Sequence, residues 1–277
     1  MARRINFINP FGTHAYDEII QKTLSHYAGT DTELTISHLE GCPADPDYFY
    51  PKHMMEMALY EAILQSQEQG FDAVISGCCY DPAVRVGREL VDIPVIGPME
   101  ASLQMAPYFG RSVAIVTDHR KACEYMRDYA KTSGLDGNIR GFEVIDWYIR
   151  DMIKDATGVG RDVIEVARKT VESTGAEAII LNCTIIAACY QQYLIEGGEP
   201  AAVPIINPNL MALKMAESLA DLWKANAYQI SRTGYYQQPP APFYKGVTAS
   251  VRKAWAKAQP SLTSSFAVED APHVPTA

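Results

Sequence analysis

The sequence predicts an α/β fold of two pseudo-symmetric halves, each built on a parallel sheet, followed by a C-terminal arm. The stretch GFDAVISGC at residues 70–78 is echoed by GAEAIILNC at 175–183. Each copy is a short continuous apolar run that ends in a cysteine, and such runs are typical of buried parallel strands. The echo continues beyond the cysteines, because IPVIGPMEASLQMA from Ile93 resembles VPIINPNLMALKMA from Val203.

The two copies keep nearly the same spacing, since Gly70 and Gly175 are as far apart in the chain as Cys78 and Cys183. We therefore expect two similar halves related by a pseudo-two-fold axis. The carboxyl ends of parallel strands are where α/β sheets place their chemistry. Cys78 and Cys183 are thus predicted to face each other across a cleft.

Composition excludes several classes of protein. The chain of 277 residues is 48% hydrophobic with a formal net charge of −9, and it has no basic run for nucleic acid. No apolar run reaches the roughly 20 residues that span a bilayer. The opening MARRINFINP lacks the apolar core of a signal peptide. We expect a cytoplasmic enzyme with a small-molecule substrate and no membrane or nucleic-acid partner.

The six cysteines are too sparse for a disulfide framework in a chain of this length. None forms a C-x-x-C pair, and neighbours on an extended backbone point in different directions, so no metal site is predicted at Cys78 and Cys79. Reduced thiols are the interpretation. Cys42, Cys123 and Cys189 are taken as small apolar core residues.

In the first half, polar residues at the loop after the first strand are candidates for substrate contacts. The elements expected are strand 4–9, a helix after residue 13, strand 33–38, helix 52–69, the strand ending at Cys78, a helix from Asp81 and Pro82, and a short strand from Ile93. Asn9 and Thr13 either cap a helix or leave backbone N–H groups free to hold a substrate oxygen. A helix starting at Asp81 would direct its positive end at the thiols and favour thiolate.

In the second half, Thr117 closes its strand as Asn9 closes the first. The elements expected are strand 112–117, helix 120–132, strand 140–145, a long helical region 151–173, the strand ending at Cys183, the helix after it, a short strand from Val203, and helix 209–225. Thr184 can offer its hydroxyl and N–H to a substrate oxygen. His119 is a candidate base, although a cap or surface position is the favoured interpretation.

From Asn226 the composition changes to an extended arm, 226–277, with one short helix near 247–258. Four aromatic residues in the arm are interrupted by prolines: Tyr235, Tyr236, Phe243 and Tyr244, with Pro239, Pro240 and Pro242. Exposed aromatics at this density would be unusual on a monomer. We predict that the arm packs across a subunit interface of a homo-oligomer. Packing over the active site and a partly disordered tail are the alternatives.

Residues 3–225 resemble the aspartate/glutamate/hydantoin racemase superfamily. INPFGT at 8–13 is similar to the family's I-N-P-N-S-T, and GCCYDPAVRVGREL is similar to the hydantoin racemase stretch G-C-F-G-D-P-G-L-x-x-x-R-E. IPVIGPMEA resembles P-V-x-G-x-x-E-A, and LNCT matches the second cysteine motif.

The resemblance implies two flavodoxin-like halves, 1–97 plus 208–225 and 98–207, with the active site in the cleft between them and no cofactor. It assigns Cys78 and Cys183 as the catalytic pair. The residues that would contact substrate are Asn9, Thr13, Cys79, Thr117 and Thr184.

Departures from the family pattern limit the substrate class. Glutamate racemase-like enzymes carry an aspartate and a histidine where Asn9 and Ile185 stand, so a free acidic amino acid fits poorly. Hydantoin racemases usually show G-C-A-G-M at the second cysteine, whereas this chain has NCTII. At the first site, Cys79 and Tyr80 replace Phe-Gly and reshape the pocket wall.

The leading hypothesis is a cofactor-independent racemase or epimerase of a hydantoin-like, carbonyl-activated stereocentre. Two thiols on opposite sides of one carbon can remove and return a proton. The alternatives are a maleate isomerase-like cis-trans isomerase, a decarboxylase, which the retention of both cysteines argues against, an amino-acid racemase, and a non-catalytic small-molecule binding protein.

Overall fold

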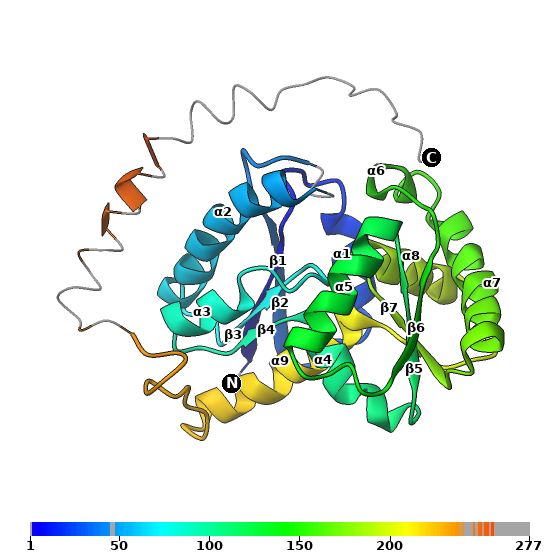
Figure 1. Ribbon diagram of the computed structural model, residues 1–277. Coiled ribbons are helices and arrows are strands. Elements are labelled where there is room, and N and C mark those ends of the chain that lie inside the picture. The colour runs from blue at the N-terminus through cyan, green and yellow to red at the C-terminus, as the bar shows by residue number, and fades with distance from the viewer. Residues whose placement is uncertain are drawn as a thin grey trace.

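Two four-stranded sheets, each entirely parallel, lie side by side and are surrounded by helices (Figure 1). The computed structural model describes residues 2–44, 48–238 and 240, and then 246, 249–250, 252–254 and 256–257. The strand orders are β2-β1-β3-β4 and β6-β5-β7-β8. The second order repeats the first, which confirms the α/β class and the internal duplication.

The first repeat begins with β1 and runs to the short 3₁₀ helix η1. Its elements are β1 Arg3–Asn9, α1 Asp17–Ser25, β2 Thr32–His38, α2 Phe49–Glu68, β3 Ala73–Ser76, α3 Val84–Leu90, β4 Val95–Ile96, α4 Pro98–Met105 and η1 Ala106–Tyr108. All four residues of β3 are buried, as its apolar run predicts. In register, Phe7 of β1 lies between Ile36 of β2 and Ile75 of β3.

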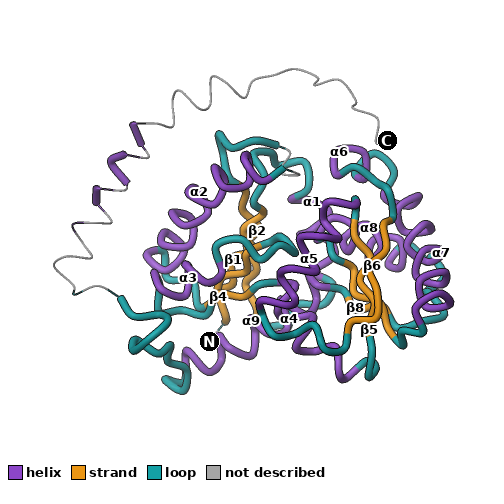
Figure 2. Tube along the Cα trace, viewed as in Figure 1, coloured by secondary structure: helices purple, strands orange, loops and turns teal. Residues whose placement is uncertain are grey.

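The second repeat follows the same order of strands. Its elements are β5 Val113–Thr117, α5 Arg120–Thr132, β6 Ile139–Val144, α6 Ile149–Met152, α7 Ala156–Thr174, β7 Ala178–Leu181, α8 Thr184–Ile195, β8 Ile205–Ile206 and α9 Pro208–Lys224. The strands form two separate groups at the centre of the trace (Figure 2).

Two helix boundaries differ from the sequence prediction. The helical region expected at 151–173 is divided, because Asp155 accepts a hydrogen bond from the Gly158 N–H and starts α7 anew. The helix expected from Asp81 begins instead at Val84, since both Asp81 and Ala83 have positive φ angles. Asp81 is occupied elsewhere, as described below.

The last helix of each repeat packs on the opposite half. Met99 and Leu103 of α4 lie in one apolar cluster with Val113 and Ile115 of β5. Conversely, α9 packs against β1, β3 and β4. This exchange is in accord with the division into 1–97 plus 208–225 and 98–207, which stays a prediction.

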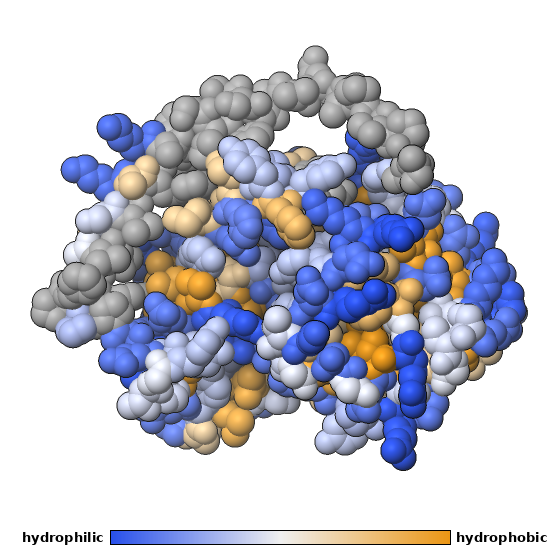
Figure 3. Space-filling view, in the orientation of Figure 1, coloured by the Kyte–Doolittle hydropathy of each residue, from blue (hydrophilic) through white to orange (hydrophobic). Residues whose placement is uncertain are grey.

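The two halves share one continuous apolar core. Ile5 and Phe7 of the first sheet belong to the same buried cluster as Val116, Leu181 and Ile185 of the second half. On the outside, the face seen in Figure 3 is largely hydrophilic, with apolar residues in separate patches. Within the described part of the chain, no helix combines the length and apolar character needed to cross a membrane.

The described part of the C-terminal arm packs on its own chain. Arg232 binds the end of α3, and Arg252 forms ion pairs with Glu61 and Glu68 of α2. The described residues 246, 249–250, 252–254 and 256–257 are helical, in accord with the short helix predicted near 247–258. Pro239, Pro242, Phe243 and Tyr244 lie outside the described residues. Packing across a subunit interface stays a prediction.

Candidate functional site

The two strand-end cysteines occupy equivalent turns, and these turns touch. Cys78 follows β3, and Cys183 follows β7 as the residue before α8. The Thr184 hydroxyl donates a hydrogen bond of 3.1 Å to the carbonyl oxygen of Gly77. The Cys78 thiol also contributes to raising the pKa of Cys183. The carboxyl ends of the two sheets therefore bring both thiols into one electrostatic environment.

The Cys183 side chain is buried. It is 8% exposed, and burial raises its pKa well above the ordinary value, helped by the charge of Asp118. The backbone N–H groups of Ile186 and Ile185, in the first turn of α8, lower that pKa in part. The helix N-terminus thus favours the thiolate of Cys183, but desolvation is the larger effect.

Cys78 is half-buried, and burial raises its pKa to about 11. The ammonium group of Lys52 and the N–H of Tyr80 act in the opposite direction. At both cysteines, burial therefore outweighs the backbone N–H groups that favour thiolate. At Cys78 the helix involved, α3, has only seven residues and begins at Val84.

Cys79 lies in the turn after β3, so the extended backbone expected for Cys78 and Cys79 is not found. Cys79 is buried in an apolar cluster with Met99, Val113 and Ile180, and its thiol donates a long hydrogen bond of 3.9 Å to the Leu181 carbonyl. The side chain therefore fastens the first half to the second. A substrate contact by Cys79 stays a prediction.

Thr117 closes β5 beside the second thiol. Its hydroxyl donates to the Asp118 carboxylate at 2.9 Å and accepts from the Asn182 amide at 3.1 Å. Asn182 directly precedes Cys183, so this network supports the second cysteine turn. The predicted substrate contacts of Thr117 and Thr184 are untested, and both hydroxyls already have protein partners.

The two candidate residues at the loop after β1, Asn9 and Thr13, lie in different surroundings. Asn9 is fully buried, and the turn that holds Cys78 is fixed beside it because the Gly77 N–H donates to the Ile8 carbonyl at 2.8 Å. Asn9 donates to Asp17. Thr13 is half-exposed and accepts from the N–H of Ala15 in a local turn. Its described contacts do not reach the cysteines, and its substrate contact stays a prediction.

The sequence interpretation missed Lys52, which lies beside Cys78. Lys52 is 6% exposed, and its ammonium nitrogen lies 2.9 Å from the ring centroid of Tyr80 and 4.8 Å from that of Tyr125. The signal was its helical spacing, because Lys52 falls on the same stripe of α2 as the buried Met55 and Leu59. A lysine on a buried stripe needs a partner for its charge.

Asp81 links the two halves above the first cysteine turn. Its carboxylate accepts hydrogen bonds from the N–H groups of Met99 and Glu100 and from the Tyr129 hydroxyl, at 2.9, 2.7 and 2.6 Å. It therefore supports the first turn of α4 rather than that of α3. Gly97 permits this approach, because a Cβ there would collide with the carboxylate. Burial raises the pKa of Asp81 to about 7.

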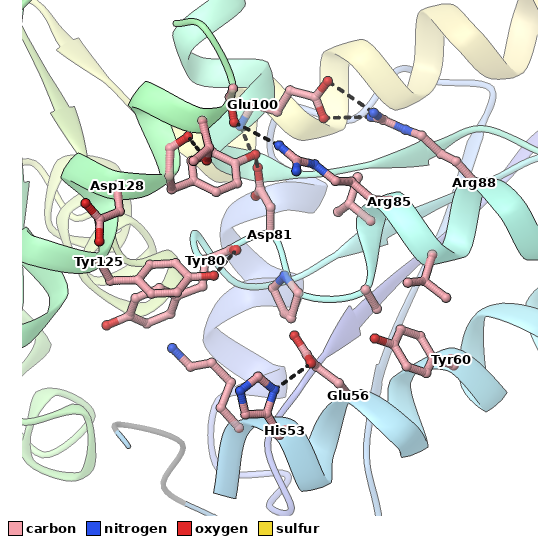
Figure 4. Close-up of a pocket in the computed structure, with 18 of the residues that line it drawn as sticks. His53, Glu56, Tyr60, Tyr80, Asp81, Arg85, Arg88, Glu100, Tyr125 and Asp128 are labelled. Atoms are coloured by element: carbon pink, nitrogen blue, oxygen red, sulfur yellow. Dashed lines mark hydrogen bonds and ion pairs between the residues drawn. The ribbon is translucent and has the colours of Figure 1, made fainter. Parts of the chain in front are cut away.

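A cavity of about 920 Å³ opens next to these residues, between α2, α3, α4 and α5 (Figure 4). Two pairs of its charged lining residues bind each other, His53 with Glu56 and Arg88 with Glu100. Rings of Tyr80 and Tyr125 meet edge to face at 4.5 Å across the boundary of the halves. Within the described residues, no group of three or more His, Cys, Asp or Glu side chains is placed to hold a metal ion.

Comparison with known proteins gives one consistent result. A family model described as Asp/Glu/Hydantoin racemase matches residues 5–216. Hydantoin racemase from Pseudomonas sp. (strain NS671) is 26% identical over 243 residues, which are 88% of this chain and 94% of that protein.

Solved structures agree with this match. Allantoin racemase from Klebsiella pneumoniae superposes with a TM-score of 0.77 at 26% identity, covering 86% of this chain and 94% of its own. Glutamate racemase from Francisella tularensis subsp. tularensis SCHU S4 shares the fold, with a TM-score of 0.53, 16% identity and coverage of 83% and 84%.

Proposed function

The chain belongs to the Asp/Glu/Hydantoin racemase family, and from this premise we propose that it is a cofactor-independent, two-cysteine racemase of a hydantoin-like stereocentre. The family resemblance in the sequence is confirmed, and the enzyme is an isomerase of the racemase type. We further propose that it acts on a small molecule in the cytoplasm as a homo-oligomer.

The observation that carries the proposal is the contact between the two cysteine turns through Thr184 and Gly77. In the proposed reaction, the thiolate of one cysteine takes the proton from the stereocentre, so an S–H bond forms as the C–H bond breaks. The electron pair moves onto the adjacent carbonyl oxygen. The thiol of the other cysteine then returns a proton to the opposite face, and the two roles are exchanged after turnover.

The N-terminus of α8 suits the negative oxygen of this intermediate. The N–H groups of Ile185 and Ile186 already favour negative charge at Cys183. A helix N-terminus supplies such donors without reorganisation during the reaction. This arrangement supports a substrate whose carbanion spreads onto a carbonyl group.

Buried amide oxygens near the cysteines favour a substrate ring that carries N–H donors. Among the described residues, the side-chain oxygens of Asn9, Asn182 and Asn209 are buried without a hydrogen-bond partner. Each such acceptor costs about 1–3 kcal/mol. The three lie around the cysteine turns, since Asn9 adjoins Ile8, Asn182 precedes Cys183, and Asn209 donates to the Thr184 carbonyl. A hydantoin ring offers N–H groups to such acceptors, whereas a free carboxylate offers none.

The test is isotope exchange at the stereocentre. Single enantiomers of allantoin, 5-methylhydantoin and 5-benzylhydantoin are incubated with the enzyme in deuterium oxide and followed by polarimetry and proton NMR. We expect loss of optical rotation together with deuterium at the stereocentre. Loss of rotation without exchange would refute the two-thiol mechanism.

A parallel incubation with maleate tests the competing hypothesis of cis-trans isomerisation. The cis-trans isomerase hypothesis requires a thiolate to add to a double bond. Maleate would then give a mass-shifted adduct at Cys78 or Cys183, followed by release of fumarate. That outcome, with inert hydantoins, would replace the racemase proposal.

A further inference from the structure

One wall of the large cavity comes from outside the region that the family model covers. The model matches residues 5–216, whereas Tyr235 and Tyr236 of the C-terminal arm line the cavity. The other lining residues come from α2, the loop before α3, α3 itself, α4 and α5. The region matched by the family model therefore supplies most of this cavity, and the arm supplies the part formed by Tyr235 and Tyr236.

The cavity reaches the neighbourhood of the first cysteine. A small gap of about 10 Å³ is lined by Cys78 together with Lys52, Glu56 and Pro82. The same three residues also line the large cavity. The two spaces therefore have part of their walls in common. For a substrate bound beside Cys78, the large cavity is thus a neighbouring space that a substituent can occupy.

The chemistry of the wall favours a planar, uncharged group. Seven tyrosine and phenylalanine residues line the cavity: Phe49, Tyr60, Tyr80, Tyr125, Tyr129, Tyr235 and Tyr236. The Asp81 carboxylate accepts from Tyr129, and the Arg88 and Glu100 side chains are paired with each other. The Lys52 ammonium lies over the rings of Tyr80 and Tyr125, whereas Tyr235 is largely exposed. An exposed ring of this kind binds other rings edge to face or offset.

The arm is fastened beside the cavity by Arg232. Its guanidinium donates to the carbonyl oxygens of Arg88, Glu89 and Val91 at 2.9, 3.1 and 2.7 Å, and it binds Asp92 at 2.5 Å. A cation is stabilised at these carbonyls because a helix C-terminus carries partial negative charge.

Arg232 also sets the local shape of the arm. It donates to the carbonyl oxygen of Tyr236 at 3.3 Å. The Tyr236 side chain in turn hydrogen-bonds Arg88, and its ring meets that of Tyr235 edge to face at 5.1 Å. Tyr235 is 72% exposed at the rim of the cavity.

Resting on the proposed function, we propose that Tyr235 and Tyr236 form a subsite for an aromatic substituent at the substrate's stereocentre, with Arg232 as the residue that positions them. The arm thereby selects among substrates while the region matched by the family model performs the proton transfer. The subsite takes a neutral aryl or arylmethyl group and offers little to a methyl group.

The experiment compares 5-benzylhydantoin with 5-methylhydantoin as racemisation substrates. In the double variant Tyr235→Ala/Tyr236→Ala and in Arg232→Ala, the ratio of kcat/KM for the benzyl to the methyl substrate should fall by about tenfold, since two ring contacts are lost. The loss should appear in KM for the benzyl substrate. Tyr235→Phe keeps the ring and should keep the ratio.

Arg252→Ala is the matched control, because Arg252 fastens the same arm to α2 through Glu61 and Glu68, away from the cavity. It should leave the ratio at the wild-type value. A ratio unchanged in the double tyrosine variant, or an equal loss for both substrates, would overturn the subsite.

A binding measurement separates this proposal from the proposed function. On a Cys78→Ser/Cys183→Ser background, calorimetry gives the affinity ratio of the two hydantoins with and without the double tyrosine substitution. If the wild type racemises neither substrate, the proposed function fails. The subsite is then supported by a lower affinity ratio in the substituted protein and refuted by an equal one.

Discussion

The Thr184 hydroxyl donates to the Gly77 carbonyl oxygen at 3.1 Å, and so each residue adjoins one of the two cysteines while belonging to opposite halves. The bond fixes the separation of the cysteine turns directly. Gly77 fits only without a side chain, because a Cβ would collide with the Phe7 ring. The spacing of the thiols thus depends on a contact between the halves.

Replacing Thr184 by valine should loosen this spacing. Thr184→Val removes one buried hydrogen bond, at a cost of about 1 kcal/mol in the free energy of unfolding. We expect kcat to fall by about tenfold or more, because small displacements of reacting groups are costly. Urea unfolding and polarimetry measure the two effects. Thr184→Ser keeps the hydroxyl and should behave as the wild type, and equal losses in both variants would contradict the prediction.

Each cysteine should be essential for removing the proton from a different enantiomer. Cys78→Ser and Cys183→Ser should both abolish racemisation, while each retains deuterium exchange from one enantiomer, a different one in each variant, because one base remains. Proton NMR in deuterium oxide makes the measurement. If Cys78→Ala keeps full activity and Cys79→Ala loses it, Cys79 is the acid/base.

Activity should rise into the alkaline range. Burial raises the pKa of Cys78 to about 11, and only a thiolate can remove the proton. Below that pH, kcat/KM should therefore increase about tenfold per pH unit. Both enantiomers should share the profile, because they are equally abundant at equilibrium. A profile that is flat from neutral pH upwards would show that the thiolate forms more readily in the working enzyme.

Lys52 should set the position of this alkaline limb. Its charge lowers the pKa of Cys78, so Lys52→Met should move the limb to higher pH and reduce kcat/KM at neutral pH. Lys121→Met is the matched control. Lys121 also lies over an aromatic ring, 4.3 Å from the Phe49 centroid, but it is not among the main charges acting on Cys78. An identical shift in both variants would contradict the prediction.

Asp81 should matter for stability through α4. Asp81→Asn replaces an acceptor of three hydrogen bonds by a group that presents N–H to other donors, at a cost of about 1–3 kcal/mol. Tyr129→Phe removes only one of the three and should cost about 1 kcal/mol. Urea unfolding measures both. An Asn variant as stable as the wild type would show that the carboxylate does not hold α4.

The sequence predicted the fold well because its signals are local. The apolar runs that became β3 and β7 are buried on both faces, and the duplicated pattern needed no knowledge of contacts. The start of α3 was misplaced because Asp81 followed by Pro82 is a strong local cap signal. A tertiary contact with α4 and Tyr129 overrides that signal.

The site was less predictable because its properties come from burial and from distant partners. A helix dipole at Cys183 can be foreseen from the sequence, but the desolvation that outweighs it depends on how tightly the halves meet. The role of Lys52 could not be predicted, because the rings that contact its ammonium group, Tyr80 and Tyr125, lie far along the chain. The sequence did not decide whether the arm lines a cavity, because its composition is compatible with several packing positions.

The exchange of α4 and α9 also bears on how the chain folds during its synthesis. The strands of the first sheet are complete at residue 96, but α9, which packs on β1, β3 and β4, ends at residue 224. At about 5–20 residues per second, the ribosome needs roughly 6–26 s to make the intervening chain. During that interval α9 is absent, and one face of the first sheet is exposed. The second half can therefore complete its core before the half that is translated first.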